Sequence, residues 1–211
     1  PPLGYLVGQA VGDKVPVIVG LRSATFDQLK AFGAASASSG SVALYHMVGI
    51  TPEARSLDEA LGGRAPLQRL VVGKAEIERT MAQMGAPTEG PVDAVGIGCP
   101  HASIDQLRRY AALLDGKRVH DGVQLWICAN AVVEAMARTM GVLDVCERAG
   151  AKLLVGTCHN DCPLDGWGFK RLVTDSGKFA YYTPTTVGTQ TIFASTEACI
   201  RAAISGRVEL P

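Results

Sequence analysis

The chain carries no net charge and contains no long apolar run. Lysine and arginine together number 20, as do aspartate and glutamate, so no excess of basic side chains is available to bind a nucleic acid or an anionic membrane surface. Apolar runs such as residues 15–20 are far shorter than the roughly 20 residues that cross a bilayer. We therefore expect neither a nucleic-acid partner nor a membrane partner.

Cysteines and targeting signals are also scarce. Six cysteines in 211 residues are too few for a disulfide scaffold, and the first residues do not form the charged and apolar regions of a secretory signal. The expected location is therefore the reducing cytoplasm. The chain opens on Pro1 and Pro2 without a methionine, which predicts a fragment or a processed chain whose active site lacks some of its members.

Aromatic residues make up only 6% of the chain, whereas apolar residues reach 47% and glycine numbers 24. This composition is typical of an aliphatic α/β core. Short, continuously apolar runs alternate with longer amphipathic stretches, as in strands that are buried on both faces of a parallel sheet. We therefore predict a doubly wound α/β fold with a mainly parallel sheet and helices on both faces. The predicted strands are residues 16–19, 42–45, 70–72, 94–97, 124–127, 152–155, 171–174 and 190–193.

Polar residues that cap helices follow several of these strands. Ser103 and Gln106 have the spacing of a capping box and predict a helix that runs to residue 114. Asn130 and Ser195 predict the starts of two further helices. Thr51 precedes a proline that suits the first turn of a helix, which predicts another start at that point.

Residues 84–91 are rich in proline and glycine and are the best linker candidate. They divide the chain into an α/β unit, residues 1–86, and a βαβ-type α/β domain, residues 92–211. The second of these carries the cysteine motifs.

Reactive side chains gather where predicted strands end, which is where open parallel sheets bind their ligands. A thiolate ligand needs access and a polarising environment, and Cys99 and Cys158 each lie in a predicted loop beside glycine and histidine. Cys146 and Cys199 fall inside helical patterns, where a lone cysteine is usually a small core residue. The other candidates at strand ends are His46, Thr51, His101, Cys128, His159, Cys162, Ser176 and Lys178.

The sequence does not match several common catalytic and ligand-binding motifs. Gly96 and Gly98 follow a predicted strand, but His101 stands where a dinucleotide-binding fingerprint has its third glycine. The sequence contains no phosphate-binding loop of the Walker A type and no Gly-x-Ser-x-Gly nucleophile elbow. Cys158 and Cys162 are not accompanied by the second close pair of a zinc finger.

Four segments resemble motifs of the aconitase X family in order and spacing. Residues 94–101 resemble its Gly-Cys-Pro-His motif, and residues 46–54 resemble its His-x-x-Gly-x-Thr-Pro-Glu-Ala segment. Residues 156–158 are similar to its Asp-Thr-Cys motif, with Gly156 in place of the acid. Residues 174–182 resemble its Asn-Ser-x-Lys-Tyr-Ala-x-Tyr run, with Asp175 and Phe179 as departures.

The resemblance covers nearly the whole chain and implies the carboxyl-terminal part of the family's large component. It implies an aconitase-like fold and a hydro-lyase that removes water from a small hydroxy acid, with iron present as an iron–sulfur cluster or as a single ion. One branch of the family acts on cis-3-hydroxy-L-proline and an archaeal branch acts on phosphorylated mevalonate. We favour the first substrate because the motif after Cys158 is less like that of the archaeal branch.

The resemblance also implies partners. These are the remaining part of the large component and a small swivel domain, either fused or supplied as a separate subunit. In aconitase-like enzymes the catalytic base is a serine on the swivel domain, so we assign no base within these residues.

The residues agree with that chemistry. Dehydration needs a proton acceptor, assistance to the departing hydroxide and a clamp for the carboxylate. Thiolates suit iron, so Cys99 and Cys158 are the expected metal ligands, with Cys162, Cys128 and His101 as less favoured ones. The expected substrate-binding residues are His46, Thr51, Ser176 and Lys178.

Two other functions stay open on the sequence. The first is a metal-free thiol enzyme, with Cys99 or Cys158 as nucleophile and His101 or His159 as base. The second is a non-catalytic ligand-binding subunit that has kept the fold, which the departures at Gly156 and Asp175 favour. Activity without iron would support the first, and tight ligand binding without turnover would support the second.

Overall fold

The computed structural model describes residues 1–85, 88–159, 168–186 and 188–209. The chain forms two compact units, Pro1–Met81 and Ala82–Pro211. None of the described helices has the length and hydrophobicity needed to cross a bilayer.

The first unit is built around two helices that touch through glycine. They are α1 (Pro2–Val11) and α2 (Phe26–Gly40). A Cβ atom added at Gly40 would collide with the backbone of Gly8, so the two helix backbones approach each other more closely than larger residues would allow. Two short parallel strands, β1 (Val17–Ile18) and β2 (His46–Met47), complete the packed part of the unit.

Three expectations in this unit are wrong. The strand predicted at 42–45 appears as β2, later in the chain, because α2 extends to Gly40 and Tyr45 instead donates its hydroxyl to the carbonyl of Leu29. Residues 70–72 form no strand with any residue that the structure describes. No helix begins at Thr51, since α3 (Leu57–Leu61) starts six residues later, capped by Ser56.

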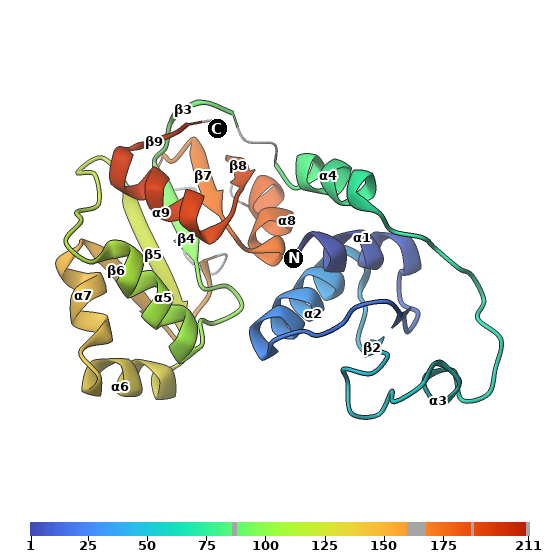
Figure 1. The fold of residues 1–211 in the computed structure, drawn as a ribbon. Coiled ribbons are helices and arrows are strands. Elements are labelled where there is room, and N and C mark those ends of the chain that lie inside the picture. Colours follow the sequence, from blue (N-terminus) through green and yellow to red (C-terminus); the bar gives the residue numbers. More distant parts are fainter. Residues whose placement is uncertain (86–87, 160–167, 187, 210–211) are drawn as a thin grey trace. The chain divides into compact units, whose positions relative to one another are not determined.

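The second unit contains a five-stranded parallel sheet in the order β6-β5-β4-β7-β8 (Figure 1). Its strands are β4 (Ala94–Ile97), β5 (Gln124–Ala129), β6 (Ala151–Val155), β7 (Arg171–Thr174) and β8 (Gln190–Phe193). This confirms the predicted parallel α/β fold, with all five of these strands where the sequence places them or extended by a residue or two. The small pair β3 (Gly90–Pro91) and β9 (Arg207–Val208) is antiparallel.

Successive residues of each central strand face opposite sides of the sheet. Val95 and Ile97 of β4 join the larger core cluster, together with residues of α5 and α9. Ala94 packs on the other side against Phe179 of α8 and Trp126 of β5. Helices therefore cover both faces, as predicted.

The predicted capping residues of this unit are confirmed. Ser103 and Gln106 form both hydrogen bonds of a capping box at α5, and Asn130 and Ser195 each accept a backbone N–H bond at the start of their helices. Satisfying these N–H groups stabilises each helix start by about 1 kcal/mol. Helix α4 (Lys74–Gln83) crosses the boundary between the two units in the sequence. The described helices of the second unit are α5 (Ile104–Leu114), α6 (Ala131–Thr139), α7 (Val142–Arg148), α8 (Gly177–Thr186) and α9 (Thr196–Ser205).

Candidate active site

The strand order of the second unit reverses at β4. The chain moves from β4 to β5 and β6 on one side, then returns to place β7 and β8 on the other. Open α/β sheets bind ligands outside the carboxyl ends of their strands at such a switch point. Cys99 follows β4 and Ser176 follows β7, so the two strands that flank the switch point both end in candidate residues.

Four side chains at this edge of the sheet act on Cys99: Cys158, Asp175, Ser176 and Lys178. Burial raises the pKa of the half-buried Cys99 thiol above its ordinary value, and the negative charges of Cys158 and Asp175 raise it further. A hydrogen bond from Ser176 and the positive charge of Lys178 lower it. Because burial dominates, Cys99 is a neutral thiol near pH 7 unless a cation stabilises its thiolate.

Ser176 links Cys99 to helix α8. Its side chain is 3% exposed, and its Oγ accepts a hydrogen bond of 3.1 Å from the backbone N–H of Phe179. The hydroxyl therefore accepts a hydrogen bond from the helix backbone and donates one to Cys99. This arrangement orients the Cys99 thiol, and a direct contact between Ser176 and substrate stays a prediction.

His101 joins the two cysteine-bearing loops. Its Nε2 donates to the carbonyl of Thr157 at 3.0 Å, so the loop after β4 is tied to the loop after β6 next to Cys158. The first of these loops also passes close to β5, because a Cβ atom at Gly98 would lie 2.7 Å from the carbonyl oxygen of Cys128. His101 thus ties the two loops together through a backbone carbonyl.

Cys128 and His159 form a buried pair beneath these loops. The His159 ring is fully buried and lies with its centre 4.7 Å from that of Phe179, and its Nε2 is 3.4 Å from Cys128 Sγ. Burial lowers the pKa of His159 to about 4, since the imidazolium would lose its solvation; the charge of His101 lowers it further, and the Trp126 backbone opposes this shift. His159 is therefore neutral near pH 7.

Replacing His159 with glutamine should flatten the pH dependence of stability. The folded pKa of about 4 lies below the ordinary value of 6.5, so the unfolded state binds more protons and stability falls as pH drops from 6.5 towards 4. The fully developed loss amounts to about 3 kcal/mol. Urea unfolding of the complete protein between about pH 4 and pH 7 measures it. The same slope in the wild type and in His159→Gln would contradict this assignment.

The candidates of the first unit form a separate group. His46 Nδ1 lies 3.0 Å from Glu53 Oε1, and hydrogen bonds from backbone and from His46 lower the pKa of that carboxyl. Thr51 Oγ1 is hydrogen-bonded to the backbone N–H and carbonyl of Met47. Their participation in the same substrate site as Lys178 stays a prediction, and Cys162 lies outside the described residues.

Sequence reasoning treated Asp175 only as a departure from a motif. Its Oδ2 accepts a hydrogen bond of 2.6 Å from Thr196 Oγ1 at the start of α9, and loss of solvation raises the pKa of its carboxyl. Its place directly after β7 was the available signal, since acids at the carboxyl ends of parallel strands are frequent site residues. Asp175 thus ties the chain between β7 and α8, just before Ser176, to the start of α9.

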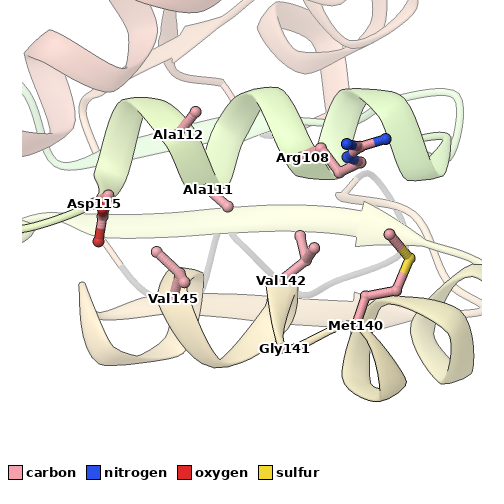
Figure 2. A pocket seen from close by; sticks show the side chains of 8 residues that line it. All are labelled: Arg108, Ala111, Ala112, Asp115, Met140, Gly141, Val142 and Val145. Atoms are coloured by element: carbon pink, nitrogen blue, oxygen red, sulfur yellow. The ribbon is translucent and has the colours of Figure 1, made fainter.

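A surface hollow elsewhere in this unit has no such chemistry. It is lined by Arg108, Ala111 and Ala112 of α5, by Asp115 directly after it, and by Met140, Gly141, Val142 and Val145, of which only Arg108 and Asp115 are charged (Figure 2). It contains neither a thiol nor an imidazole, so the strand ends remain the candidate site.

The donor set at the strand ends fits iron in part. Cys99 and Cys158 are soft sulfur donors whose charges interact. Among the described residues, no group of three or more histidine, cysteine or acidic side chains could hold a metal ion. Any further ligand must therefore come from beyond those residues or from a rearrangement of them.

Family models match both units of the chain. The aconitase X second domain matches residues 1–82, and the aconitase X third domain matches residues 92–205. The chain belongs to the aconitase X family. This confirms the family that the four sequence motifs resemble.

Named relatives of this family are considerably longer than the chain. A cis-3-hydroxy-L-proline dehydratase of Pseudomonas aeruginosa is 40% identical over 98% of this chain and 36% of its own length. A phosphomevalonate dehydratase large subunit of Methanocaldococcus jannaschii is 34% identical, over 94% of this chain and 48% of its own length. The crystal structure of Thermococcus kodakaraensis aconitase X in its holo-form has a TM-score of 0.85 and 32% identity, covering 96% of this chain and 50% of that one. The chain thus spans between about a third and a half of these aconitase X proteins.

Proposed function

We propose that the complete protein containing this chain is a hydro-lyase that removes water from a small hydroxy acid, most specifically cis-3-hydroxy-L-proline. The carrying observation is the cluster of Cys99, Cys158, Ser176 and Lys178 at the switch point of the parallel sheet. Dehydratase-named relatives support the reaction class. The 40% identity with the cis-3-hydroxy-L-proline dehydratase of Pseudomonas aeruginosa supports the substrate.

In this proposal Cys99 and Cys158 hold iron. When bound, iron supplies a Lewis acid for the hydroxyl group that leaves. Ser176 fixes the direction of the Cys99 thiol, and Lys178 in the first turn of α8 offers a positive charge to the substrate carboxylate. We place the proton acceptor outside this chain, on a small swivel domain or subunit.

The structure gives less support to a thiol enzyme with a Cys–His pair. His101 donates to the Thr157 carbonyl, and His159 is buried against Cys128. Burial also raises the pKa of Cys99, which reduces the thiolate fraction that such an enzyme needs.

The second candidate is dehydration of phosphomevalonate by the same type of site. It is favoured by large subunits of this activity, such as that of Methanothermobacter thermautotrophicus, which is 35% identical over 90% of this chain. Both substrates need a cation for an acidic group, so Lys178 serves either proposal.

The deciding experiment uses the complete protein, purified without oxygen. We would measure iron, acid-labile sulfide, and water loss from cis-3-hydroxy-L-proline and from phosphomevalonate. Stoichiometric iron with turnover of the first substrate is expected, and the sulfide content separates a cluster from a single ion. Absence of iron after reconstitution refutes the metal assignment. Turnover of phosphomevalonate alone would show that phosphomevalonate is the substrate. Binding of either compound without turnover would show that the protein is a ligand-binding subunit and not an enzyme.

Replacing Lys178 with alanine should weaken substrate binding more than metal binding. Loss of a charge-assisted hydrogen bond is worth about 1.5–3 kcal/mol, so KM should rise roughly 10-fold to 100-fold. Lys117→Ala, on an exposed residue after α5, is the matched control. Steady-state kinetics and iron analysis of both variants measure the effect. Loss of iron in Lys178→Ala would instead show that this side chain supports the metal site.

A further inference from the structure

A segment of the first unit has the composition of a strand but pairs with no strand of the described residues. Residues 62–73 connect α3 to α4; after a turn at Gly62 and Gly63, residues 64–73 form neither helix nor strand (Figure 1). No backbone hydrogen bond joins residues 65–72 to any residue that the structure describes. The aliphatic run Leu70, Val71 and Val72 within it is the kind that forms strands in folded proteins.

The apolar side chains of this segment face solvent. Leu67 is 91% exposed and Val71 is 94% exposed, while Leu70 is half exposed. In a strand, Leu67, Arg69 and Val71 would lie on one face because side chains alternate. One isolated apolar residue on a surface needs no explanation, but an unpaired extended backbone with two almost fully exposed aliphatic side chains is a template for strand addition.

The rest of the first unit also has a small sheet and exposed apolar side chains. Within the described part of the chain its sheet consists of β1 and β2, paired in parallel over two residues each, whereas parallel sheets are normally larger and covered on both faces. Most of the large apolar side chains that the structure describes as exposed lie within residues 1–81. The unit thus leaves both backbone edges and apolar surface available to another part of the protein.

Family membership indicates which part of the protein would cover this surface. The unit matches a second domain and is followed by a third, and relatives are about two to three times as long as this chain. A first domain therefore belongs to the same component. Residues 62–74 contain Arg64, Arg69 and Lys74 but no acidic residue, so the complementary surface should be apolar with acidic side chains beside it.

We propose that residues 67–72 form a strand that pairs with the first domain of the aconitase X component. The backbone N–H and carbonyl groups of the segment supply the ladder of hydrogen bonds, and Leu67 and Val71 are buried beneath the partner. This interaction concerns assembly of the component and is independent of the proposed dehydration.

Hydrogen–deuterium exchange of the complete component tests the proposal. Alternate amides of residues 67–72, those that point towards the partner strand, should exchange roughly 100-fold or more slowly than unprotected amides. Exchange at the unprotected rate would overturn the proposal. Protection that disappears when the component is diluted to a monomer would also overturn it, because a second copy would then be the partner.

Two substitutions separate strand pairing from a general effect of surface charge. Val71→Asp should lower the Tm of the complete component by about 3 °C or more, whereas Val132→Asp on α6, at a side chain that is also largely exposed, should leave it unchanged. Equal Tm changes would contradict the proposal.

Cross-links from the exposed Lys74 should reach the first domain, and links that reach only the swivel domain would refute the proposal.

Discussion

Replacing Cys99 with serine should abolish dehydration by the complete protein while leaving its fold intact. The thiol lies in the loop after β4, next to Ser176 and in electrostatic contact with Cys158. A serine hydroxyl keeps the size of the side chain but is a poor ligand for a soft metal ion. A Lewis acid contributes several kcal/mol to such a reaction, so the expected loss in kcat is about 10³-fold or more.

Cys146→Ser is the matched control for this experiment. Cys146 is buried on α7, where burial raises the pKa of its thiol to about 11, and it lies among core residues. Its replacement should cost about 1–3 kcal/mol of stability through a poorly satisfied hydroxyl and leave iron content and kcat unchanged. Circular dichroism, iron analysis and kinetics would be compared. Undiminished turnover in a folded Cys99→Ser protein would remove Cys99 from the metal site.

Replacing Phe179 with alanine should destabilise the second unit by about 3–5 kcal/mol. The ring is fully buried between the sheet and α8, with its centre 4.7 Å from that of His159. It packs so closely on β4 that a Cβ atom added at Gly96 would lie 2.8 Å from it. Removing the ring leaves a cavity between the helix that carries Lys178 and the loop that carries Cys158.

Urea unfolding measures this effect, and Tyr181→Ala provides the control on the same helix. Tyr181 is 38% exposed, so its truncation should cost much less. Substrate affinity should also fall in Phe179→Ala, because Lys178 precedes the lost anchor in the chain. Equal destabilisation by the two substitutions would show that α8 is not held to the sheet through Phe179.

The central strands of the second unit, β4, β5 and β7, were predictable because they are buried on both faces. Continuous aliphatic runs such as 94–97 and 171–174 identify such strands without any knowledge of their neighbours. The ends of these runs in turn located Cys99, Ser176 and Lys178. Capping residues added the helix starts, since a cap acts on N–H groups two or three positions away.

The first unit was less predictable. Thr51 and the run at 70–72 carry the local signals of a helix start and of a strand, yet neither element forms. Thr51 is engaged by the backbone of Met47, and residues 70–72 find no strand beside them among the described residues. A local signal forms an element only where tertiary neighbours stabilise it.

By itself, the sequence determined the parallel α/β fold of residues 92–205, the starts of α5, α6 and α9, and the family motifs around the cysteines. These depend on local patterns of burial, capping and residue identity. Only the tertiary structure decided that Cys128 and His159 are buried together, that His101 binds Thr157, and that Cys99 meets Ser176 at the switch point. Those contacts join residues in or directly after different strands, and their geometry depends on strand order and on the face that each side chain takes.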